Sequence, residues 1–531
     1  MADKKVFPPS PNQAAIYHAV TDENGDIRIR AVAGSGKTYT LKQIFKLIEQ
    51  GKKAIYVAFN RDIVAELKPE APAHIQVCTL HSFGLNEIRF KYGRNRDFEE
   101  FKDEAKTSRH ILRHAENWSE FKPQPEDTED DKRRREAEKK SYCTIIEKLI
   151  DMFRQSLPQS PEEVQMLIQK FDIPCYNGEL ERAKAVFLDV RKDFNTFDFT
   201  DMIYRPAVGD WRLKQYDFVF VDEAQDMNRA QQTVINKMIK PNGGRLIVVG
   251  DPKQAIYGFA GADSDSFENF SKIRPGIVDM PLDVCYRCSA AVIRHTQQIM
   301  ANIQARPGAD EGFVGIGSYK MVKPGDYVLC RNTRPLVSLC MKYISQGIKA
   351  NIKGRDIGTN LINMVKGTGT KGIEPCFNKL DKDLGKLREK AQKQYPLRAP
   401  DEVPVVGNMI DKIEALRTIA STYKCKTTED LNKVILEIFQ EKSKDDTIVL
   451  STIHKSKGLE ADNIFIIEPQ LMPAKWAKQE WELAQEGNLS YVARTRAKHN
   501  LYYIDDFVSD PEKMKEVKDA IENVLAYQKE N

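Results

Sequence analysis

Eight residues, AVAGSGKT at 31–38, combine small side chains with a lysine and a hydroxyl group. In a loop between a strand and a helix, this spacing leaves backbone N–H groups open to an anion, beside the positive end of the helix. The loop residues that would surround phosphate groups are Ala33, Gly34, Ser35 and Gly36. Lys37 would reach terminal phosphates, and Thr38 would bind Mg²⁺. Ala31 replaces a glycine of the usual pattern and is small enough to let the loop close.

Two adjacent carboxylates follow a second apolar run, in YDFVFVDEAQD at 216–226. A nucleoside triphosphatase needs one carboxylate to hold the metal through water and another to orient the attacking water. We therefore assign Asp222 to Mg²⁺ and Glu223 to water activation. Alone, such a pair is also typical of surface carboxylates after a strand. Together with the 31–38 segment, it indicates triphosphate hydrolysis.

Strands and a helix must hold these residues in place. Ile27, Ile29 and Ala31 alternate with polar neighbours, which predicts a strand before the loop. After the loop, Leu41 and Ile44 begin an apolar repeat at helical spacing. The run at 218–221 predicts a short buried strand that ends at the carboxylates. In open α/β sheets, sites form at this carboxyl end of the strands.

Length and composition exclude several classes of protein. The 531 residues are too many for one compact core, and indicate about three or four units of roughly 100–200 residues each. No apolar stretch is long enough to cross a membrane, and the N-terminus lacks the apolar core of a secretory signal. We therefore expect a cytoplasmic or nucleoid-associated, intracellular protein that has no membrane partner.

The nine cysteines indicate reduced thiols, because their number is odd and their positions are scattered. Only Cys285 and Cys288 have the spacing of metal ligands. Zinc is one alternative for this pair. Because there is no second CxxC pair and no nearby histidine pair, two small packed side chains are the favoured interpretation.

The net charge of +4 does not by itself indicate a nucleic-acid-binding protein, so any such surface must be local. The densest basic stretch is DKRRREAEKK at 131–140, which follows the acidic EDTED. It is typical first of a solvent-exposed helix face. A patch that contacts phosphates is the second interpretation.

Seven segments resemble, in the same order, the motifs of the UvrD/Rep group of superfamily 1 helicases. They are AVAGSGKT, VCTLHSFG, VDEAQD, VVGDPKQAIYGFAGA, VCYRCS, STIHKSKGLE and YVARTRA. With Gln13, they extend to Ala497 and so cover essentially the whole chain. The resemblance implies an α/β fold with two RecA-like P-loop motor domains, each having a parallel sheet and a mainly helical insertion. It also implies ATP and Mg²⁺ as cofactors.

The resemblance also implies roles for individual residues around the nucleotide. Gln13 would read the adenine edge, Gln254 would sense the terminal phosphate, and Tyr286 would stack on the base. Glu460 would lie at the ribose, with Gly458 of the same motif among the nucleotide-binding residues.

Two arginines are implied as arginine fingers, Arg287 and Arg496. Their chemistry is reasonable on physical grounds, because charge that develops on the transferred phosphoryl group must be neutralised by a guanidinium. If that guanidinium withdraws after hydrolysis, the withdrawal provides the movement. Outside these motifs, an isolated arginine is more typical of a surface salt bridge.

The implied partner is single-stranded DNA, together with junctions between single and double strands. Phe59, Tyr257 and Phe259 occupy positions that stack on bases in the family, and base stacking is worth about 1–3 kcal/mol. His81 and His454 fall where the family touches the DNA backbone. The other positions implied as DNA-binding are Asn60 and Thr79.

The motifs divide the chain into motor domains and insertions. The expected parts are a first RecA-like domain at 1–95 and 196–283, its helical insertion at 96–195, a second RecA-like domain at 284–360 and 445–531, and its short insertion at 361–444. DFTDMI at 198–203 resembles the family segment that returns to the first motor. Asp198 and Asp201 could instead be a helix N-cap and a surface charge, and neither is expected to be catalytic.

The first functional hypothesis is an ATP-driven translocase and helicase on single-stranded DNA, with 3′–5′ polarity by resemblance alone. A second is a DNA-gated ATPase sensor that works with a partner nuclease in defence or repair. The short second insertion favours it, as does GFAGA in place of the family's GWRGA. An RNA helicase is a third. A protein partner from replication, repair or defence machinery is also expected.

Overall fold

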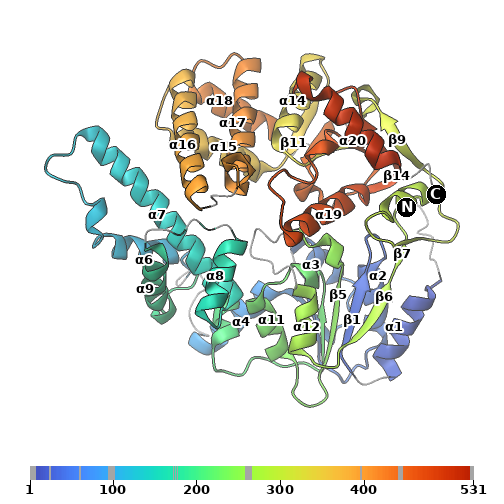
Figure 1. Cartoon of the computed structure of the whole chain (residues 1–531). Helices are drawn as coiled ribbons and strands as arrows, with labels where there is room; N and C mark the ends of the chain where they lie inside the picture. Colours follow the sequence, from blue (N-terminus) through green and yellow to red (C-terminus); the bar gives the residue numbers. More distant parts are fainter. Residues whose placement is uncertain are drawn as a thin grey trace. The chain divides into compact units, whose positions relative to one another are not determined.

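The computed structural model describes residues 8–22, 25–58, 61–93, 102–171, 173, 175, 178–256, 266–394, 398–439 and 447–526. The chain divides into two compact units. The first comprises Met1–Ala31 and Lys37–Leu282, and the second comprises Val32–Gly36 and Asp283–Asn531. Each unit contains a six-stranded parallel sheet with helices beside it (Figure 1). The α/β class with parallel sheets that the sequence predicts is therefore confirmed.

The sheet of the first unit has the order β3-β2-β4-β5-β1-β6. Its strands are β1 Ile27–Ala31, β2 Ala54–Ala58, β3 Ile75–Thr79, β4 Phe218–Val221, β5 Arg245–Gly250 and β6 Val278–Leu282. All neighbouring strands are parallel, and the register pairs Val57 with Val221 and Val221 with Val248. The carboxyl ends of β2, β4 and β5 therefore meet at one edge of the sheet.

Both faces of this sheet are buried, which explains why its strands are nearly continuous apolar runs. Successive residues of a strand point to opposite faces. Val219 packs into one apolar cluster, whereas its neighbour Phe220 packs into the other. Arg28 is also buried, because its guanidinium binds Asp279 of the neighbouring strand, with an Nε–Oδ1 distance of 2.6 Å.

Helices cover this sheet and extend beyond it. The helices of the first unit are α1 Pro11–Asp22, α2 Lys37–Leu47, α3 Arg61–Leu67, α4 Leu80–Tyr92, α6 Lys106–Ala115, α7 Glu129–Ser156, α8 Pro161–Lys170, α9 Glu179–Lys192, α10 Asp201–Val208, α11 Arg229–Met238 and α12 Ser266–Ile273. Its 3₁₀ helices are η1 Ser119–Phe121, η2 Ala224–Asp226 and η3 Pro252–Gln254.

Helices α6, α7, α8 and α9 form a helical region with its own apolar core (Figure 1). Ile146, Leu149 and Ile150 of α7 lie in this core, as does Val186 of α9. The long α7 begins with a capping box, in which Thr128 accepts the backbone N–H of Asp131. Most of the described side chains at 131–140 are exposed, as expected for a solvent-exposed helix face.

A buried network of charges ties this helical region to α10. Asp201 accepts hydrogen bonds from Lys106 Nζ at 2.7 Å and from Arg205 Nε at 3.0 Å. Asp198 accepts a hydrogen bond from Arg154 at 2.7 Å, and it also accepts the backbone N–H of Asp201 at 2.8 Å, as a capping side chain does. The expectation that Asp201 could be a surface charge is wrong, because its side chain is fully buried among cations.

The sheet of the second unit has the order β11-β12-β10-β13-β14-β9, again with parallel neighbours. The strands of this unit, including a separate two-stranded sheet of β7 and β8, are β7 Val284–Cys285, β8 Gln304–Ala305, β9 Phe313–Gly317, β10 Tyr327–Cys330, β11 Ala350–Lys353, β12 Ile448–Thr452, β13 Ala461–Ile466 and β14 Ala497–Ile504.

The helices of the second unit are α13 Ala290–Thr296, α14 Thr333–Ser345, α15 Arg355–Gly367, α16 Ile373–Gln394, α17 Pro404–Thr422, α18 Thr428–Ile438, α19 Glu480–Arg494 and α20 Met514–Ala526. Helices α14 to α18 share a large apolar core with the sheet. The 3₁₀ helices of this unit are η5 Tyr319–Met321, η6 Pro400–Glu402, η8 His454–Ser456, η9 Pro469–Leu471 and η10 Pro511–Lys513. Across the described ranges, every helix is too short or too polar to cross a bilayer.

Candidate active site

The loop that the sequence predicts to bind phosphate lies between β1 and α2. Gly34 and Gly36 have positive φ angles of 66° and 78°, a conformation that glycine adopts without steric cost. The Ser35 hydroxyl is buried and has no hydrogen-bond partner in the described part of the chain. Within the second unit, which includes residues 32–36, the N–H of Ala33 donates to the Tyr491 hydroxyl at 2.8 Å. The loop therefore presents a small-residue backbone and a buried, unused hydroxyl group.

The two predicted carboxylates lie at the carboxyl end of β4, beside the first residue of α2. Lys37 Nζ is 3.0 Å from Glu223 Oε1. Asp222 accepts hydrogen bonds from the Tyr56 hydroxyl at 2.7 Å and from the backbone N–H of Glu223 at 2.8 Å. The structure thus brings together the lysine and both carboxylates that the sequence singled out. It adds Tyr56, which the sequence gave no reason to select.

The charges of this cluster shift one another's pKa values. Burial raises the pKa of Asp222 to about 6, and the neighbouring charge of Glu223 adds to this shift. Burial acts to lower the pKa of Lys37, but the negative charges of Glu223, Asp222 and Asp251 outweigh it and raise the pKa. Lys37 therefore stays protonated and supplies a fixed positive charge.

Amide side chains extend the cluster from β4 to the end of β5. Gln225 donates to Glu223 Oε2 at 2.5 Å and accepts the backbone N–H of Asp251 at 3.1 Å. Gln254, in η3, donates to Asp251 Oδ2 at 2.7 Å. A Cβ added to Gly250 would lie 2.5 Å from Gln225 Oε1, so glycine gives this amide the space to bridge two strands. Gln225 and Asp251 are further residues that the sequence did not single out.

Gln13 lies on α1, which precedes β1 in the sequence, and Thr38 lies on α2, which follows the loop. Gln13, in α1, is buried, and it donates to the Thr40 hydroxyl of α2 at 3.0 Å. Its Oε1 accepts the backbone N–H of Ser10 at 2.9 Å. Thr38 is the second residue of α2 and is partly buried.

In the second unit, Arg287 and Glu460 form an ion pair, with Nε and Oε2 2.6 Å apart. Lys498 Nζ lies 3.0 Å from the other carboxylate oxygen. Burial acts to raise the pKa of Glu460, but Arg287 and Lys498 outweigh it and lower the pKa. The N–H of Tyr286 donates to the carbonyl of Gly34, in the loop segment of this unit, at 2.8 Å.

Arg496 is buried and directs its guanidinium to backbone carbonyl groups. Its Nε donates to Val492 at 3.1 Å, and another guanidinium nitrogen donates to Leu459 at 3.1 Å. Burial, together with the positive charge of Arg287, lowers the pKa of Arg496 to about 10. Gly458, next to Leu459 in the chain, has a positive φ of 84°. The motif residues 458, 460, 287 and 496 thus lie together in the second unit.

The residues implied to bind DNA are only partly described. Thr79 accepts the backbone N–H of Ser82 at 3.2 Å and so caps α4. The His81 ring stacks on Phe199, with ring centroids 4.0 Å apart. Burial lowers the pKa of His81 to about 4, and burial with nearby cations lowers that of His454 to about 3, so both imidazoles are neutral at pH 7. The remaining predicted DNA-binding residues lie outside the described ranges: Phe59, Asn60, Tyr257 and Phe259.

Cys285 and Cys288 are both buried, and the backbone N–H of Cys288 donates to the Cys285 sulfur at 3.4 Å. The side-chain hydrogen bond from Cys288 lowers the pKa of Cys285 to about 7. Among the residues that the structure describes, no group of three or more His, Cys, Asp or Glu side chains could hold a metal ion. The arrangement is that of two small side chains packed together.

Comparison with known proteins places two helicase family models on the chain. The UvrD/REP helicase N-terminal domain matches residues 12–275, and the UvrD-like helicase C-terminal domain matches residues 362–505. The first match lies toward the N-terminus and the second toward the C-terminus, and together they cover most of the chain.

Individual relatives match over shorter segments. A probable DNA helicase II homolog from Mycoplasma capricolum is 34% identical over 121 residues, which is 21% of this chain and 16% of the relative. The ATP-dependent DNA helicase PcrA of Staphylococcus aureus is 29% identical over 133 residues, 25% of this chain and 17% of the relative. PcrA of Leuconostoc citreum is 32% identical over 139 residues, 23% of this chain and 17% of the relative. The matched segments thus span about a sixth of these relatives' length.

Proposed function

The chain belongs to the UvrD/Rep-like superfamily 1 helicases, and on this premise we propose that it is a DNA helicase that hydrolyses ATP. We further propose that it moves along single-stranded DNA from 3′ to 5′ and opens junctions between single and double strands. The cluster at the carboxyl ends of β4 and β5 supports the hydrolytic part. The direction of movement rests on the family resemblance.

The donor set of the loop fits a triphosphate with Mg²⁺. Gly34 and Gly36 keep the backbone accessible, and Ser35 has a buried hydroxyl without a partner in the described residues. When bound, ATP with Mg²⁺ supplies the phosphoanhydride bond to be cleaved and a positive charge beside it. Thr38 and Asp222 would hold the metal ion.

Lys37 and Glu223 are the residues whose contacts must change during turnover. Their ion pair neutralises a partly buried carboxylate. Once Lys37 turns to a phosphate, Glu223 is released to accept a proton from the attacking water. Gln225 donates to Glu223 and keeps that carboxylate oriented, and the Tyr56 hydroxyl does the same for Asp222.

The family motifs assign two further guanidinium groups to phosphoryl transfer. Arg287 and Arg496 would neutralise charge that develops on the transferred phosphoryl group. Glu460 binds Arg287 in this structure, and this ion pair would hold the arginine in place before it contacts the phosphoryl group. The assignment of the two arginines, like those of Gln13, Gln254 and the DNA-binding residues, follows the family motifs, which place Glu460 at the ribose.

The single observation that carries the proposal is the Lys37–Glu223 contact at 3.0 Å, beside buried Asp222 at the end of a parallel strand. A lysine after a small-residue loop and two carboxylates at the end of another strand of the same sheet are the parts that phosphoryl transfer requires. Neither the lysine nor the carboxylate pair alone would indicate phosphoryl transfer.

Parallel assays of ATP hydrolysis and strand displacement test the proposal. The full chain should hydrolyse ATP faster with single-stranded DNA and should displace a strand from a duplex that has a 3′ single-stranded tail. Glu223→Gln should lose both activities while it still binds ATP. Turnover that continues unchanged in this variant would refute the assigned site. Hydrolysis without displacement on either tail would refute the helicase and leave a DNA-gated ATPase.

A further inference from the structure

Glu460 has a cation at each of its two carboxylate oxygens. Arg287 Nε lies 2.6 Å from Oε2, and Lys498 Nζ lies 3.0 Å from Oε1. The side chain of Glu460 is 38% exposed, so this carboxylate is partly withdrawn from water. The sequence singled out Arg287 and Glu460, but it gave no reason to select Lys498. With two cations, Glu460 keeps one positively charged partner if the other leaves.

Strand pairing keeps Lys498 next to Glu460. β13 and β14 are neighbouring parallel strands, and their register pairs Ala461 with Ala497. Glu460 directly precedes Ala461, and Lys498 directly follows Ala497. Arg287 lies instead between β7 and α13, so its contact with Glu460 depends on the conformation of its long side chain. Of the two cations, Lys498 is therefore the one that the fold holds in place.

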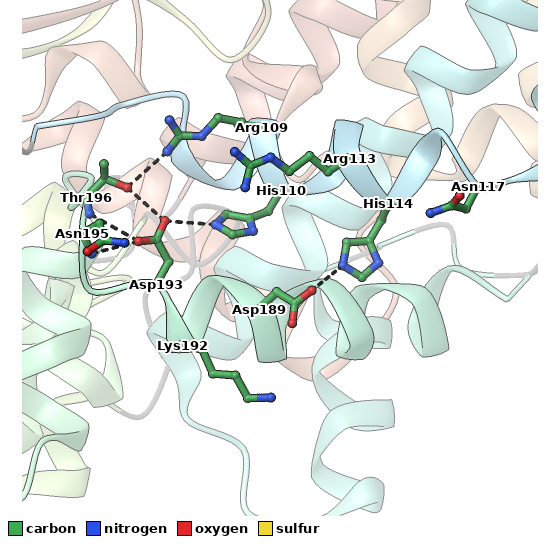
Figure 2. A pocket seen from close by; sticks show the side chains of 10 residues that line it. All are labelled: Arg109, His110, Arg113, His114, Asn117, Asp189, Lys192, Asp193, Asn195 and Thr196. Carbon is green, nitrogen blue, oxygen red and sulfur yellow. Dashed lines mark hydrogen bonds and ion pairs between the residues drawn. The ribbon is translucent and has the colours of Figure 1, made fainter.

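Contacts between acidic side chains and histidines in the first unit show an arrangement that is only structural. Asp193 contacts His110 Nε2 at 3.1 Å, and Asp189 contacts His114 Nε2 at 2.7 Å (Figure 2). These contacts join α6 to α9 and to the residue that follows α9, and none of the four residues belongs to the seven motifs. The charges around Glu460 differ, because one of them is expected to change partners during turnover.

In the proposed function, Arg287 turns from Glu460 to the transferred phosphoryl group. This change vacates Oε2 of a partly buried carboxylate, and leaving such a charge without a partner costs free energy. Lys498 lowers the cost, because it stays at Oε1. We propose that Lys498 is a positioning residue that neutralises Glu460 and thereby allows Arg287 to leave it. This inference rests on the proposed function.

ATP hydrolysis by the full chain, with saturating single-stranded DNA, tests the proposal. Lys498→Gln should lower kcat by about three- to tenfold, because Arg287 must then leave an unpaired carboxylate that is only partly screened by solvent. Lys498→Arg keeps a cation and should retain most of the parent's kcat.

The matched control is Lys379→Gln in α16. Lys379 Nζ is also 3.0 Å from a carboxylate oxygen, that of Asp383, and the two side chains are 41% and 38% exposed. The lysine of the Glu460 contact is 37% exposed, so both substitutions break ion pairs of equal length and similar exposure. Lys379→Gln should hydrolyse ATP like the parent, because its pair is far from the motifs in the sequence.

Binding measurements separate this role from general support of the nucleotide site. Calorimetry should give the same affinity for ADP in Lys498→Gln and in the parent, since ADP lacks the phosphoryl group that Arg287 approaches. ADP with aluminium fluoride imitates that group during transfer, and its affinity should fall by the same factor as kcat. Equal affinities of the two proteins for ADP with aluminium fluoride would overturn the proposal. So would an equal loss of affinity for both ligands, because Lys498 would then support nucleotide binding only.

A double-mutant cycle with Glu460→Gln tests whether Lys498 acts through Glu460. Without the carboxylate there is no negative charge for Lys498 to neutralise, so adding Lys498→Gln to Glu460→Gln should not lower kcat further. If Lys498→Gln lowers kcat by the same factor in both backgrounds, the lysine acts on the nucleotide directly and the proposal is wrong.

Thermal unfolding provides a check that the variants fold. If Lys498→Gln is unstable, Lys498→Met replaces it, since methionine keeps an unbranched apolar chain and removes only the charge. The absence of ATP hydrolysis by the parent chain would overturn both the proposed function and this inference. Hydrolysis by the parent, with an unchanged kcat in a folded Lys498→Gln or Lys498→Met variant, would overturn this inference alone.

Discussion

Replacing Asp201 by asparagine should destabilise the first unit more than any single change at its surface. Asp201 is completely buried and accepts hydrogen bonds from Lys106 at 2.7 Å and Arg205 at 3.0 Å. It also lies 2.9 Å from a guanidinium nitrogen of Arg154. The substitution keeps the shape of the side chain but removes a negative charge that contacts all three cations, although Arg154 keeps its contact with Asp198.

The expected cost follows from the kind of contact that is lost. Breaking a buried ion pair by removing one partner costs about 3–5 kcal/mol, because the remaining charge is left uncompensated. Burial already lowers the pKa of Lys106 with Asp201 in place. Without Asp201, Lys106 can lose its proton and become neutral. The loss in unfolding free energy cannot exceed the cost of this deprotonation. Domains of about 150–250 residues lose roughly 2–4 °C per kcal/mol, so the unfolding temperature of this slightly larger unit should fall by about 6–20 °C or somewhat less.

The assay is thermal unfolding of the full chain, combined with limited proteolysis to locate the part that opens first. The matched control is Glu129→Gln, which breaks the exposed contact of Glu129 with Lys132 at 2.9 Å. Exposed pairs contribute little to stability, so the control should unfold like the parent chain. Cleavage in Asp201→Asn should begin in the helical region of α6 to α9. A shift no larger than that of the control would refute the view that this network holds the region to α10.

Three other changes test the site and the second unit. Lys37→Ala should abolish ATP hydrolysis, and near-normal turnover would remove the loop from the active site. Tyr56→Phe removes the hydroxyl that donates to Asp222, so turnover should fall by about tenfold for a lost hydrogen bond to a charged group, and an unchanged rate would contradict this contact. Burial, with nearby Arg494, lowers the pKa of His295 to about 2, so the unfolded chain binds the extra proton as pH falls below about 6.5. In urea unfolding, His295 alone should cost the second unit up to about 2 kcal/mol of stability between pH 7 and pH 5, beside the similar contribution of buried His454. His295→Gln should therefore make the pH dependence shallower without removing it, and equal slopes in both proteins would refute this assignment.

Much of the sheet of the first unit could be predicted from sequence. The apolar run at 218–221 is β4, and the alternating residues Ile27, Ile29 and Ala31 lie in β1. Short strands that are buried on both faces require apolar residues, and turns or charged residues mark their ends. Local composition is therefore enough to find such strands. The same reasoning located the loop and the carboxylates at the strand end.

Long-range charge pairing could not be predicted in this way. Lys106 and Asp201 are 95 residues apart, and Arg28 and Asp279 are 251 residues apart. Periodicity reports which side chains share a face of one element, and gives no information about a partner on a distant element. For this reason Asp201 resembled a surface charge in the sequence, although its side chain is buried.

Tyr56 and Gln225 were not predicted as site residues for the same reason, because their partners lie on other strands. Tyr56 resembled an ordinary core residue of a strand, and only the pairing of β2 with β4 places its hydroxyl beside Asp222. Gln225 is within a motif, but its role as a bridge between Glu223 and Asp251 depends on the packing of two strands. The assigned catalytic and DNA-binding roles and the domain boundaries stay predictions.

We propose that ATP hydrolysis at the site of Lys37, Asp222 and Glu223 moves the chain along single-stranded DNA. The most direct test is stopped-flow fluorescence on single strands of increasing length, with a dye at either the 5′ or the 3′ end. We expect a delay that grows in proportion to length for the 5′ dye, no such delay for the 3′ dye, and neither signal in Glu223→Gln. ATP hydrolysis without any length-dependent delay at either end would contradict this proposal.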